Sequence, residues 1–236
     1  MKVPLHKKIR ADLLEKIKTG EYRENQLIPT ELELAERYQV SRPTIRQAVQ
    51  ALVDEGYLEK RKKRGTIVKK PKIQQEFTHV IESFDSEMNR KGIIPKTKIL
   101  NFLQTTANEE VAENLKLELG ERVYKLTRLR YAEEKPIVLV ISYIPYKLFP
   151  QFQEVDFTKE KMYQVFEDMG HPIRTVTRKL EVIKADETIS DLLDIAEDDP
   201  LFYFHTQGFS DDHLPIEYSI SKYRGDINYF VFELSQ

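Results

Sequence analysis

Two arginines and a threonine stand close together at the start of a segment with the pattern of an amphipathic helix. Arg42, Thr44 and Arg46 fall within about one and a half turns of that start. Arginine can bind the O6 and N7 acceptors of guanine, and threonine can contact a thymine methyl group or a phosphate. The alternative is a solvated helix face whose arginines pair with acids such as Glu31 or Asp54. The first interpretation predicts a helix that reads DNA bases.

Four consecutive cations follow this helix. Arg61, Lys62, Lys63 and Arg64 precede Gly65, in the turn between two short strand-like segments. Such a tip fits the electronegative minor groove or the adjacent phosphates. Taken alone, the run is equally typical of a solvated group of charges. Its place after the arginine-bearing helix favours a second contact to DNA.

Charge is distributed unevenly along the 236 residues, although the net charge is only −2. Residues 1–70 contain 17 Lys and Arg against 10 Asp and Glu, whereas the remaining residues contain 20 and 29. A basic segment joined to an acidic remainder indicates that polyanion binding is confined to one domain.

Three helices and a hairpin are expected to position these cations. Residues 4–18 have helical apolar spacing, Thr30 and Glu33 form a capping box before a second helix, and Ser41 caps the third. Two short strands around the cationic turn follow. This order predicts a winged helix-turn-helix, in which the amides beside Thr30 and Ser41 can also hold a phosphate.

A second pair of arginines occurs in the acidic part of the chain. Arg128 and Arg130 alternate with Leu129 in a strand-like run, so both guanidinium groups point to one face. Two converging guanidinium groups suit a phosphate or a carboxylate. The alternative is a pair of surface salt bridges to acids such as Glu133 and Glu181.

This pair belongs to a predicted α+β domain that contains an internal repeat. The apolar spacing of residues 107–117 recurs in 185–195, and the likeness continues through the strand-like runs that follow. Two copies of a unit of helix, strand, turn and strand would build a mostly antiparallel sheet. We expect domains at residues 1–70 and 77–236, with residues 71–76 as a linker.

The composition excludes several classes of site. The chain has no cysteine, which excludes disulfides, thiolate zinc sites and cysteine nucleophiles. No glycine-rich phosphate loop, HExxH or GxSxG motif occurs, and the five histidines show no metal-ligand spacing. We expect no catalytic residue, metal or cofactor, no membrane span or membrane partner, and a cytoplasmic location.

These motifs resemble those of a known family. Residues 4–69 are similar to the winged-helix domain of GntR-type bacterial transcription regulators, and residues 77–236 to the UTRA effector-binding domain of their HutC branch. The matching residues of the first domain are Ile28, Pro29, Thr30, Glu31, Leu34, Ala35, Val40, Ser41, Arg42, Thr44, Ile45, Arg46, Ala48, Leu52, Glu55, Gly56, Gly65, Thr66, Ile67 and Val68. Those of the second are Ser83, Phe84, Met88, Gly92, Arg128, Arg130, Tyr131, Pro136, Ile137, Ser142, Tyr143, Ile144, Pro145, Leu214, Pro215, Ile216, Glu217, Tyr218, Ser219, Tyr223, Arg224, Gly225 and Asp226.

The resemblance implies a homodimer that binds double-stranded operator DNA with two-fold symmetry. It also implies a small-molecule effector in the second domain and a fold similar to chorismate lyase for that domain. Arg42, Thr44 and Arg46 fall on DNA-contacting positions of the family, and Gly65 on its wing glycine. Lys63 stands where the family wing usually has another glycine.

The same resemblance implies contacts to the effector. In relatives with sugar-phosphate effectors, the arginine pair helps to hold the phosphate, and Glu217 and Tyr223 fall on positions that contact hydroxyl groups. The further candidates are Ser83, Phe84, Lys161 and Tyr163. Asp85 stands where Ser or Thr often binds phosphate, and Val140 where sugar-phosphate binders often have Glu. We expect a small anionic metabolite, such as a phosphorylated sugar.

Three functions remain open at this stage. The chain can be a regulator, most simply a repressor, whose DNA affinity the metabolite controls. It can be an enzyme, because its second domain resembles a lyase fold. It can also be an architectural DNA-binding protein whose pocket has no function. Fold is weak evidence for chemistry, and the DNA-reading domain favours regulation. Turnover of the metabolite would indicate the enzyme, and DNA binding that ignores metabolites would indicate the architectural protein.

Overall fold

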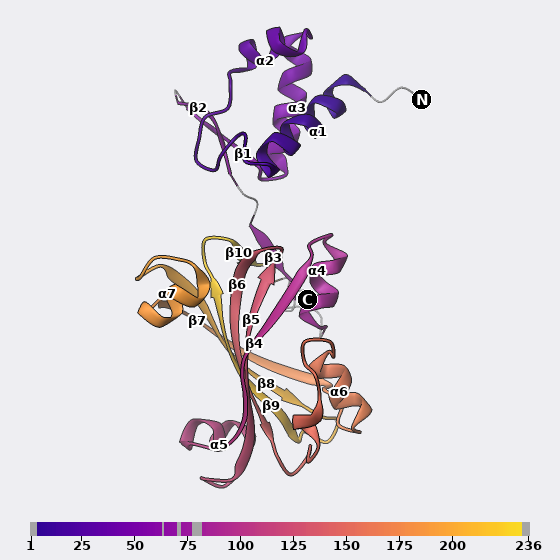
Figure 1. The fold of residues 1–236 in the computed structure, drawn as a ribbon, viewed down its shortest axis with the longest axis vertical. Coiled ribbons are helices and arrows are strands. Elements are labelled where there is room, and N and C mark those ends of the chain that lie inside the picture. Colours follow the sequence, from indigo (N-terminus) through magenta and orange to yellow (C-terminus); the bar gives the residue numbers. More distant parts are fainter. Residues whose placement is uncertain (1–3, 63, 70–71, 77–81, 233–236) are drawn as a thin grey trace. The chain divides into compact units, whose positions relative to one another are not determined.

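The computed structural model describes residues 4–62, 64–69, 72–76 and 82–232, and it divides the chain into two units, Met1–Ile73 and Gln74–Gln236 (Figure 1). Lys63, which the sequence analysis places among the DNA contacts, lies outside the described residues. None of the described helices combines the length and the apolar composition that a bilayer-spanning segment requires.

Three helices followed by a hairpin make up the first unit, in the order that the sequence predicts. The elements are α1 (Leu5–Lys18), α2 (Glu31–Tyr38), α3 (Arg42–Asp54), β1 (Leu58–Arg61) and β2 (Gly65–Val68). Each helix buries one apolar stripe in a common core, whose fully buried members include Leu13, Leu34, Ile45 and Leu52. The core fixes α3 and leaves its polar face in solvent.

The starts of α2 and α3 are built differently. At α2, Oγ1 of Thr30 accepts a hydrogen bond from the N–H of Glu33 (3.3 Å), and Oε2 of Glu33 accepts one from the N–H of Thr30 (2.7 Å), which confirms the capping box. Ser41 is the N-cap residue of α3, but its side chain makes no cap hydrogen bond. Pro43 has no N–H to donate, and the N–H of Thr44 already donates to the carbonyl of Ser41 (3.0 Å). The predicted side-chain cap is therefore wrong, and the Ser41 hydroxyl lies 2.9 Å from that of Thr44 instead.

Glycine is required at the start of β2. The hairpin pairs Arg61 of β1 with Gly65, whose φ is +101°. A Cβ atom at Gly65 would lie 2.9 Å from Cδ2 of Leu27, in the loop before α2. Both the backbone conformation and the close approach of Leu27 therefore exclude other residues without rearrangement.

A six-stranded antiparallel sheet forms the centre of the second unit. Its strands follow the order β4-β5-β6-β9-β8-β7. Their bounds are β4 (Pro95–Thr106), β5 (Arg122–Ala132), β6 (Lys135–Pro145), β7 (Thr175–Lys184), β8 (Pro200–Phe209) and β9 (Pro215–Arg224). The predicted α+β class and antiparallel sheet are confirmed. The structure adds β4 and β7, the two edge strands, which the sequence analysis does not name.

The order of the strands makes the internal repeat visible. One half consists of β4, α5 (Glu109–Leu115), β5 and β6, and the other of β7, α7 (Glu187–Leu193), β8 and β9. The halves meet where β6 pairs with β9. Lys116 and Asp194, which end the two equivalent helices, both adopt left-handed backbone conformations.

Helices cover both faces of this sheet (Figure 1). On one face, α5 and α7 pack on separate apolar clusters. The other face carries α4 (Phe84–Arg90), the 3-10 helix η1 (Phe152–Glu154) and α6 (Met162–Asp168). Leu129 of β5 is buried in the cluster beneath α7, so its neighbours Arg128 and Arg130 point to the face under α4 and α6.

A two-stranded sheet includes most of the described part of the expected linker. β3 (Ile73–Gln75) pairs with β10 (Asn228–Phe230). Gln75 and Asn228 are fully buried, and Nε2 of Gln75 donates to Oδ1 of Asn228 at 2.8 Å. The polar composition of residues 71–76 does not reveal this strand, because its partner is more than 150 residues away in sequence.

The different helix starts give a matched test of stability. We expect Thr30→Ala to lower the free energy of unfolding by about 1 kcal/mol, because the capping box is lost. Ser41→Ala should lower it by clearly less, since Ser41 makes no cap hydrogen bond. Urea unfolding of the full chain, followed by circular dichroism without DNA, measures both. Equal losses would contradict the assigned difference.

Candidate functional site

The polar face of α3 carries the predicted base-reading residues. Arg42 and Arg46 are exposed, and Thr44 is half-buried with its hydroxyl close to that of Ser41. Ile45 of the same helix is fully buried. The arginines therefore project from the side of α3 that does not pack on the core, where a base edge could reach them.

Arg46 also forms the ion pair that the alternative interpretation predicts. Its Nε lies 3.3 Å from Oε2 of Glu31, and Nζ of Lys60 lies 3.2 Å from the other carboxylate oxygen. Burial opposes ionisation of Glu31, but the hydrogen bonds from Lys60 and Arg46 outweigh this and lower the pKa of its carboxyl group. The Arg46 side chain remains 65% exposed, so this pair is weak and a phosphate or base can replace it.

The cations in and beside the wing, the β1–β2 hairpin, differ in whether they form an ion pair. Arg61 and Lys69 both pair with Glu59, at 3.5 and 2.9 Å. Lys62 and Arg64 are exposed, and neither forms an ion pair within the part of the chain that the structure describes. These two side chains are therefore the wing charges most available to a nucleic-acid backbone.

A single cavity in the second unit brings together all eight predicted effector residues. They are Ser83, Phe84, Arg128, Arg130, Lys161, Tyr163, Glu217 and Tyr223. The sheet forms the floor, and α4 and the start of α6 form the walls. The volume of about 110 Å³ is several times the roughly 10–15 Å³ that one water molecule needs, so a small organic molecule fits.

A hydrogen-bonded chain of three buried polar side chains crosses the floor. Arg128 on β5 donates through Nη2 to Oγ of Ser142 on β6 (3.0 Å), and Ser142 donates to Oε1 of Glu217 on β9 (2.7 Å). All three residues are at most 4% exposed. The chain fixes the orientation of the guanidinium and carboxylate groups before any ligand binds.

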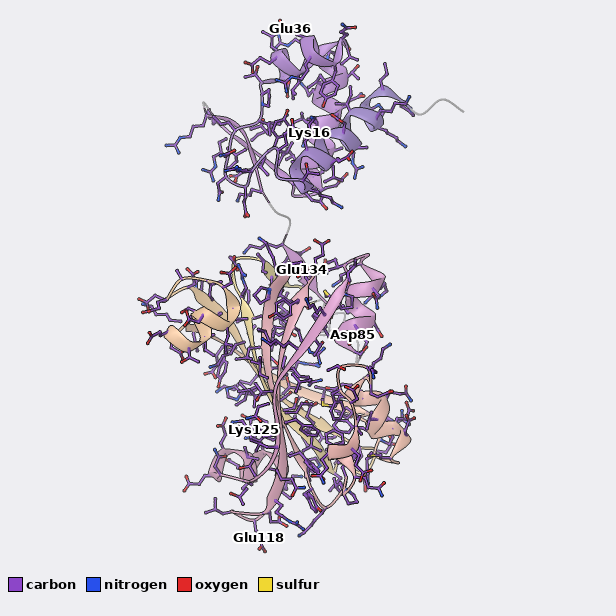
Figure 2. All side chains as sticks on the ribbon, viewed as in Figure 1. Lys16, Glu36, Asp85, Glu118, Lys125 and Glu134 are labelled. Carbon is purple, nitrogen blue, oxygen red and sulfur yellow. The ribbon has the colours of Figure 1, made fainter. Side chains whose placement is uncertain are left out.

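Arg130 lies beside Arg128 and against α4. Its guanidinium carbon is 4.8 Å from the centre of the Phe84 ring. Burial, and then the charge of Arg130, lower the pKa of Arg128 to about 9. Burial also lowers the pKa of Arg130, although the carboxylate of Asp85, labelled on α4 in Figure 2, opposes this. An anion bound between the arginines would relieve the strain of two like charges in a poorly solvated place.

Several buried polar atoms at this cavity have no hydrogen-bond partner among the described residues. They are Nε of Arg128, Nε of Arg130 and Oε2 of Glu217. Leaving such atoms unpaired costs about 1–3 kcal/mol each, and more for charged groups, so native proteins rarely do so without a reason. Two donors and one acceptor at one cavity suit a ligand that carries both an anionic group and a hydroxyl.

Sequence reasoning missed several polar residues of the same cavity. On the strands these include Arg178, Thr206, Ser219 and Ser221, and the other missed polar residues are Glu82, Glu87, Thr97 and Glu160. The two serines follow Glu217 at a spacing of two on β9, so the alternation of a strand could have found them. Arg178 lies on β7, which was not predicted. Neither Arg128 nor Arg130 forms an ion pair with Glu133 or Glu181 among the described residues. Oε2 of Glu181 lies 3.1 Å from Nζ of Lys179 instead.

α4 ties the wall of the cavity to the segment that follows the first unit. Oε1 of Glu87 accepts hydrogen bonds from the backbone N–H of Glu76 (2.5 Å) and from Nζ of Lys91 (2.6 Å). Lys91 also donates to the carbonyl of Gln74, and Arg90 pairs with Glu76 (2.6 Å). Glu87 itself lines the cavity, so one helix contacts both the ligand space and residues 74–76.

The opposite face of the sheet holds a smaller polar cluster. Nδ1 of His205 lies 2.7 Å from the hydroxyl of Tyr218, which donates to Oε1 of Glu110 on α5 (2.5 Å). No group of three or more His, Asp or Glu side chains within the described ranges is arranged to hold a metal ion. His205 is therefore a hydrogen-bonded strand residue in this structure.

Comparisons with known proteins agree with both units. Residues 5–68 match the model of "Bacterial regulatory proteins, gntR family", and residues 90–227 match that of the UTRA domain. The chain is 30% identical to the HTH-type transcriptional repressor NagR of Bacillus subtilis, over 97% of this chain and 94% of NagR. It is 27% identical to the Mannosyl-D-glycerate transport/metabolism system repressor MngR of Escherichia coli, over 94% and 92%.

The fold is also similar to a solved structure, that of PhnF from Mycobacterium smegmatis. The TM-score is 0.79 at 25% sequence identity, and the match covers 96% of this chain and 99% of PhnF. The helix-turn-helix model and the UTRA model together account for both units, and the relatives are transcription regulators and not enzymes. The chain therefore belongs to the gntR family of bacterial regulatory proteins, in the HutC subfamily, with a DNA-binding helix-turn-helix domain followed by an effector-binding UTRA domain.

Proposed function

We propose that the chain is a homodimeric repressor whose affinity for operator DNA falls when a small phosphorylated sugar-like metabolite occupies the UTRA cavity. The observation that carries the effector part is the buried arginine pair. Arg128 and Arg130 each have an unpaired Nε at the cavity, beside a carboxylate oxygen of Glu217 that is also unpaired. This combination of donors and acceptor fits a phosphate attached to a hydroxyl-bearing body.

The DNA part of the proposal rests on the exposed cations of the first unit. Arg42, Thr44 and Arg46 would contact bases or phosphates in the major groove from α3. Lys62 and Arg64 would contact the backbone or the minor groove beside the wing, with Lys63 between them in sequence. Thr30 and Ser41 begin α2 and α3, where the positive end of the helix dipole favours a phosphate.

The effector part assigns separate tasks to the cavity residues. Arg128 and Arg130 hold the phosphate, with Lys161 and Ser83 at the edge of the same space. Phe84 covers the guanidinium group of Arg130, so its movement would follow phosphate binding. Glu217, Tyr163 and Tyr223 contact the hydroxyl groups.

Contacts of α4 support a route from the ligand to the DNA-binding domain. A ligand that draws Phe84 toward the arginine pair acts on the same helix that holds residues 74–76 through Glu87, Arg90 and Lys91. Those residues directly follow the first unit. A typical coupling energy of about 1–3 kcal/mol would suffice to change the affinity for DNA by 5- to 150-fold.

The names of the relatives support repression and a carbohydrate-related effector. NagR is named a repressor, and MngR is named the repressor of a mannosyl-D-glycerate transport and metabolism system. A two-fold operator and a homodimer follow from the resemblance to this family, and a regulator of transcription would act in the cytoplasm. Light scattering of the purified chain, alone and with DNA, measures the proposed dimer.

The first test concerns base reading by α3. We expect Arg46→Ala to lower the affinity for an operator selected from random DNA by the wild-type chain, by about 1–3 kcal/mol. Arg37→Ala is the matched control, because Arg37 is exposed on α2 and contacts Tyr22 instead. A DNA-binding titration measures both variants. Equal affinity of Arg46→Ala and wild type would remove Arg46 from the reading helix.

The second test concerns the wing. We expect the double variant Lys62→Ala/Arg64→Ala to make the slope of log K against log salt less negative by about 2. Each phosphate contact contributes about −0.9 to this slope, and two contacts would be lost. The double variant Lys8→Ala/Lys18→Ala on α1 removes the same formal charge elsewhere in the domain. If both double variants change the slope equally, only the net charge matters and the wing makes no phosphate contact.

The third test concerns the arginine pair. We expect hexose 6-phosphates that raise the melting temperature of the wild-type chain to bind Arg130→Gln about 10- to 100-fold more weakly, since a charge-assisted hydrogen bond is lost. Operator affinity without ligand should stay unchanged. Arg122→Gln is the control, because Arg122 lies on the same strand over the Tyr146 ring. Undiminished binding by Arg130→Gln would contradict the proposed phosphate site.

A further inference from the structure

Arg178 brings a third guanidinium group to the cavity, from the opposite edge of the sheet. It lies on β7 opposite Thr206 of β8, which in turn lies opposite Ser219 of β9. Four strand intervals separate β7 from β5, or about 19 Å between backbones at roughly 4.8 Å each. Arg178 therefore enters the cavity from the side facing Arg128 and Arg130.

The floor of the cavity carries more positive than negative charge. Its strands contribute three arginines and one carboxylate, that of Glu217, which is joined to Arg128 through Ser142. Of the acids at the wall, Glu87 is bonded to Lys91 at 2.6 Å, and Glu82 pairs with Arg90. These two wall acids are held by cations outside the cavity. Asp85, at the same wall, favours the charged form of Arg130, and Glu160 and Lys161 line the cavity as one further acid and one further cation. The excess of positive charge therefore lies on the strands of the floor.

Hydroxyl groups occupy the floor between the two arginine positions. Thr206, Ser219 and Ser221 line the cavity from β8 and β9, and each is at most 8% exposed. A buried hydroxyl is most stable when it has a hydrogen-bond partner, and it can both donate and accept. These three hydroxyl groups therefore fit a ligand that carries several hydroxyl groups and extends across the strands.

Electrostatic effects on the cavity tyrosines agree that all three arginines border the same space. Burial raises the pKa of Tyr223, and the charges of Arg130, Arg178 and Arg128 oppose that rise. Tyr163, which faces the same space from α6, also feels Arg178 and Arg128. All three positive groups thus act on one enclosed volume.

We propose that the effector is a polyol with two separated anionic groups, a phosphate held by Arg128 and Arg130 and a carboxylate held by Arg178. A single guanidinium group matches a carboxylate through two parallel hydrogen bonds, whereas two converging arginines suit a phosphate. This inference rests on the proposed function and narrows its ligand class. It makes Arg178 the residue that selects sugar-acid phosphates over neutral sugar phosphates.

Three open-chain probes with the same carbon skeleton separate the two subsites. Glucitol 6-phosphate carries only the phosphate, gluconate only the carboxylate, and 6-phosphogluconate both. We would titrate each into the full-length wild type, Arg178→Gln and Arg178→Lys by calorimetry at one pH and salt concentration. Lys179→Gln is the control, because Lys179 is the neighbouring residue of β7 and pairs with Glu181 outside this cavity.

We expect wild type and Lys179→Gln to bind 6-phosphogluconate at least about tenfold more tightly than glucitol 6-phosphate. In Arg178→Gln this preference should disappear while the affinity for glucitol 6-phosphate stays the same, which also shows that the variant is folded. Arg178→Lys should retain part of the preference, because the charge remains.

Two results would contradict this inference without contradicting the proposed function. One is equal wild-type affinity for the two phosphorylated probes, and the other is a preference that Arg178→Gln leaves intact. If neither phosphorylated probe binds any of the proteins, and inorganic phosphate does not bind either, the proposed phosphate site fails as well.

Discussion

Two positive charges buried side by side constrain the whole second unit. Arg128 and Arg130 occupy successive positions on one face of β5, and only Glu217, reached through Ser142, is held close to the pair from the floor. Buried charges are tolerated when they are paired and hydrogen-bonded, and here that requirement is only partly met. Phe84 covers Arg130, and Asp85 favours its charged form. An anion that bonds to the unpaired Nε atoms would complete this arrangement.

The duplicated architecture explains why polar groups can occupy one face without disrupting the fold. Each half of the repeat supplies a helix to the opposite face, where α5 and α7 pack on apolar clusters that contain no member of the cavity. Apolar packing on that face, together with the aromatic cluster around Phe152, can therefore stabilise the domain. The cavity between the halves can then remain polar. The edge strand β7 of the second half then adds a charge, Arg178, to the cavity from the edge of the sheet opposite to β4.

Much of this could be predicted from the sequence, because strong local signals specify it. The alternation of Arg128, Leu129 and Arg130 correctly predicted that both arginines share one face, and the capping box at Thr30 correctly predicted the start of α2. The missed parts depend on tertiary contacts. The edge strands β4 and β7 are half-exposed and polar, so they lack the apolar runs that reveal a central strand. Strand β3 depends on a buried partner, Asn228, at the far end of the chain. The missing side-chain cap at Ser41 has a local cause instead: Pro43 has no N–H to donate, and this could have been read from the sequence.

The contacts of α4 link the cavity to residues 74–76, and the proposed regulation depends on this link. Its first residue, Phe84, contacts an arginine of the floor, and Glu87 in its middle accepts a hydrogen bond from the backbone N–H of Glu76. At its end, Arg90 pairs with the Glu76 side chain, and Lys91, the C-cap residue, donates to the carbonyl of Gln74. A helix is stiff along its axis, so movement at one end displaces the other. Because Gln75 is anchored to Asn228 by a buried hydrogen bond, residues 74–76 have few alternative positions. Under the proposed function, a ligand that moves α4 would therefore also move residues 74–76, which directly follow the first unit.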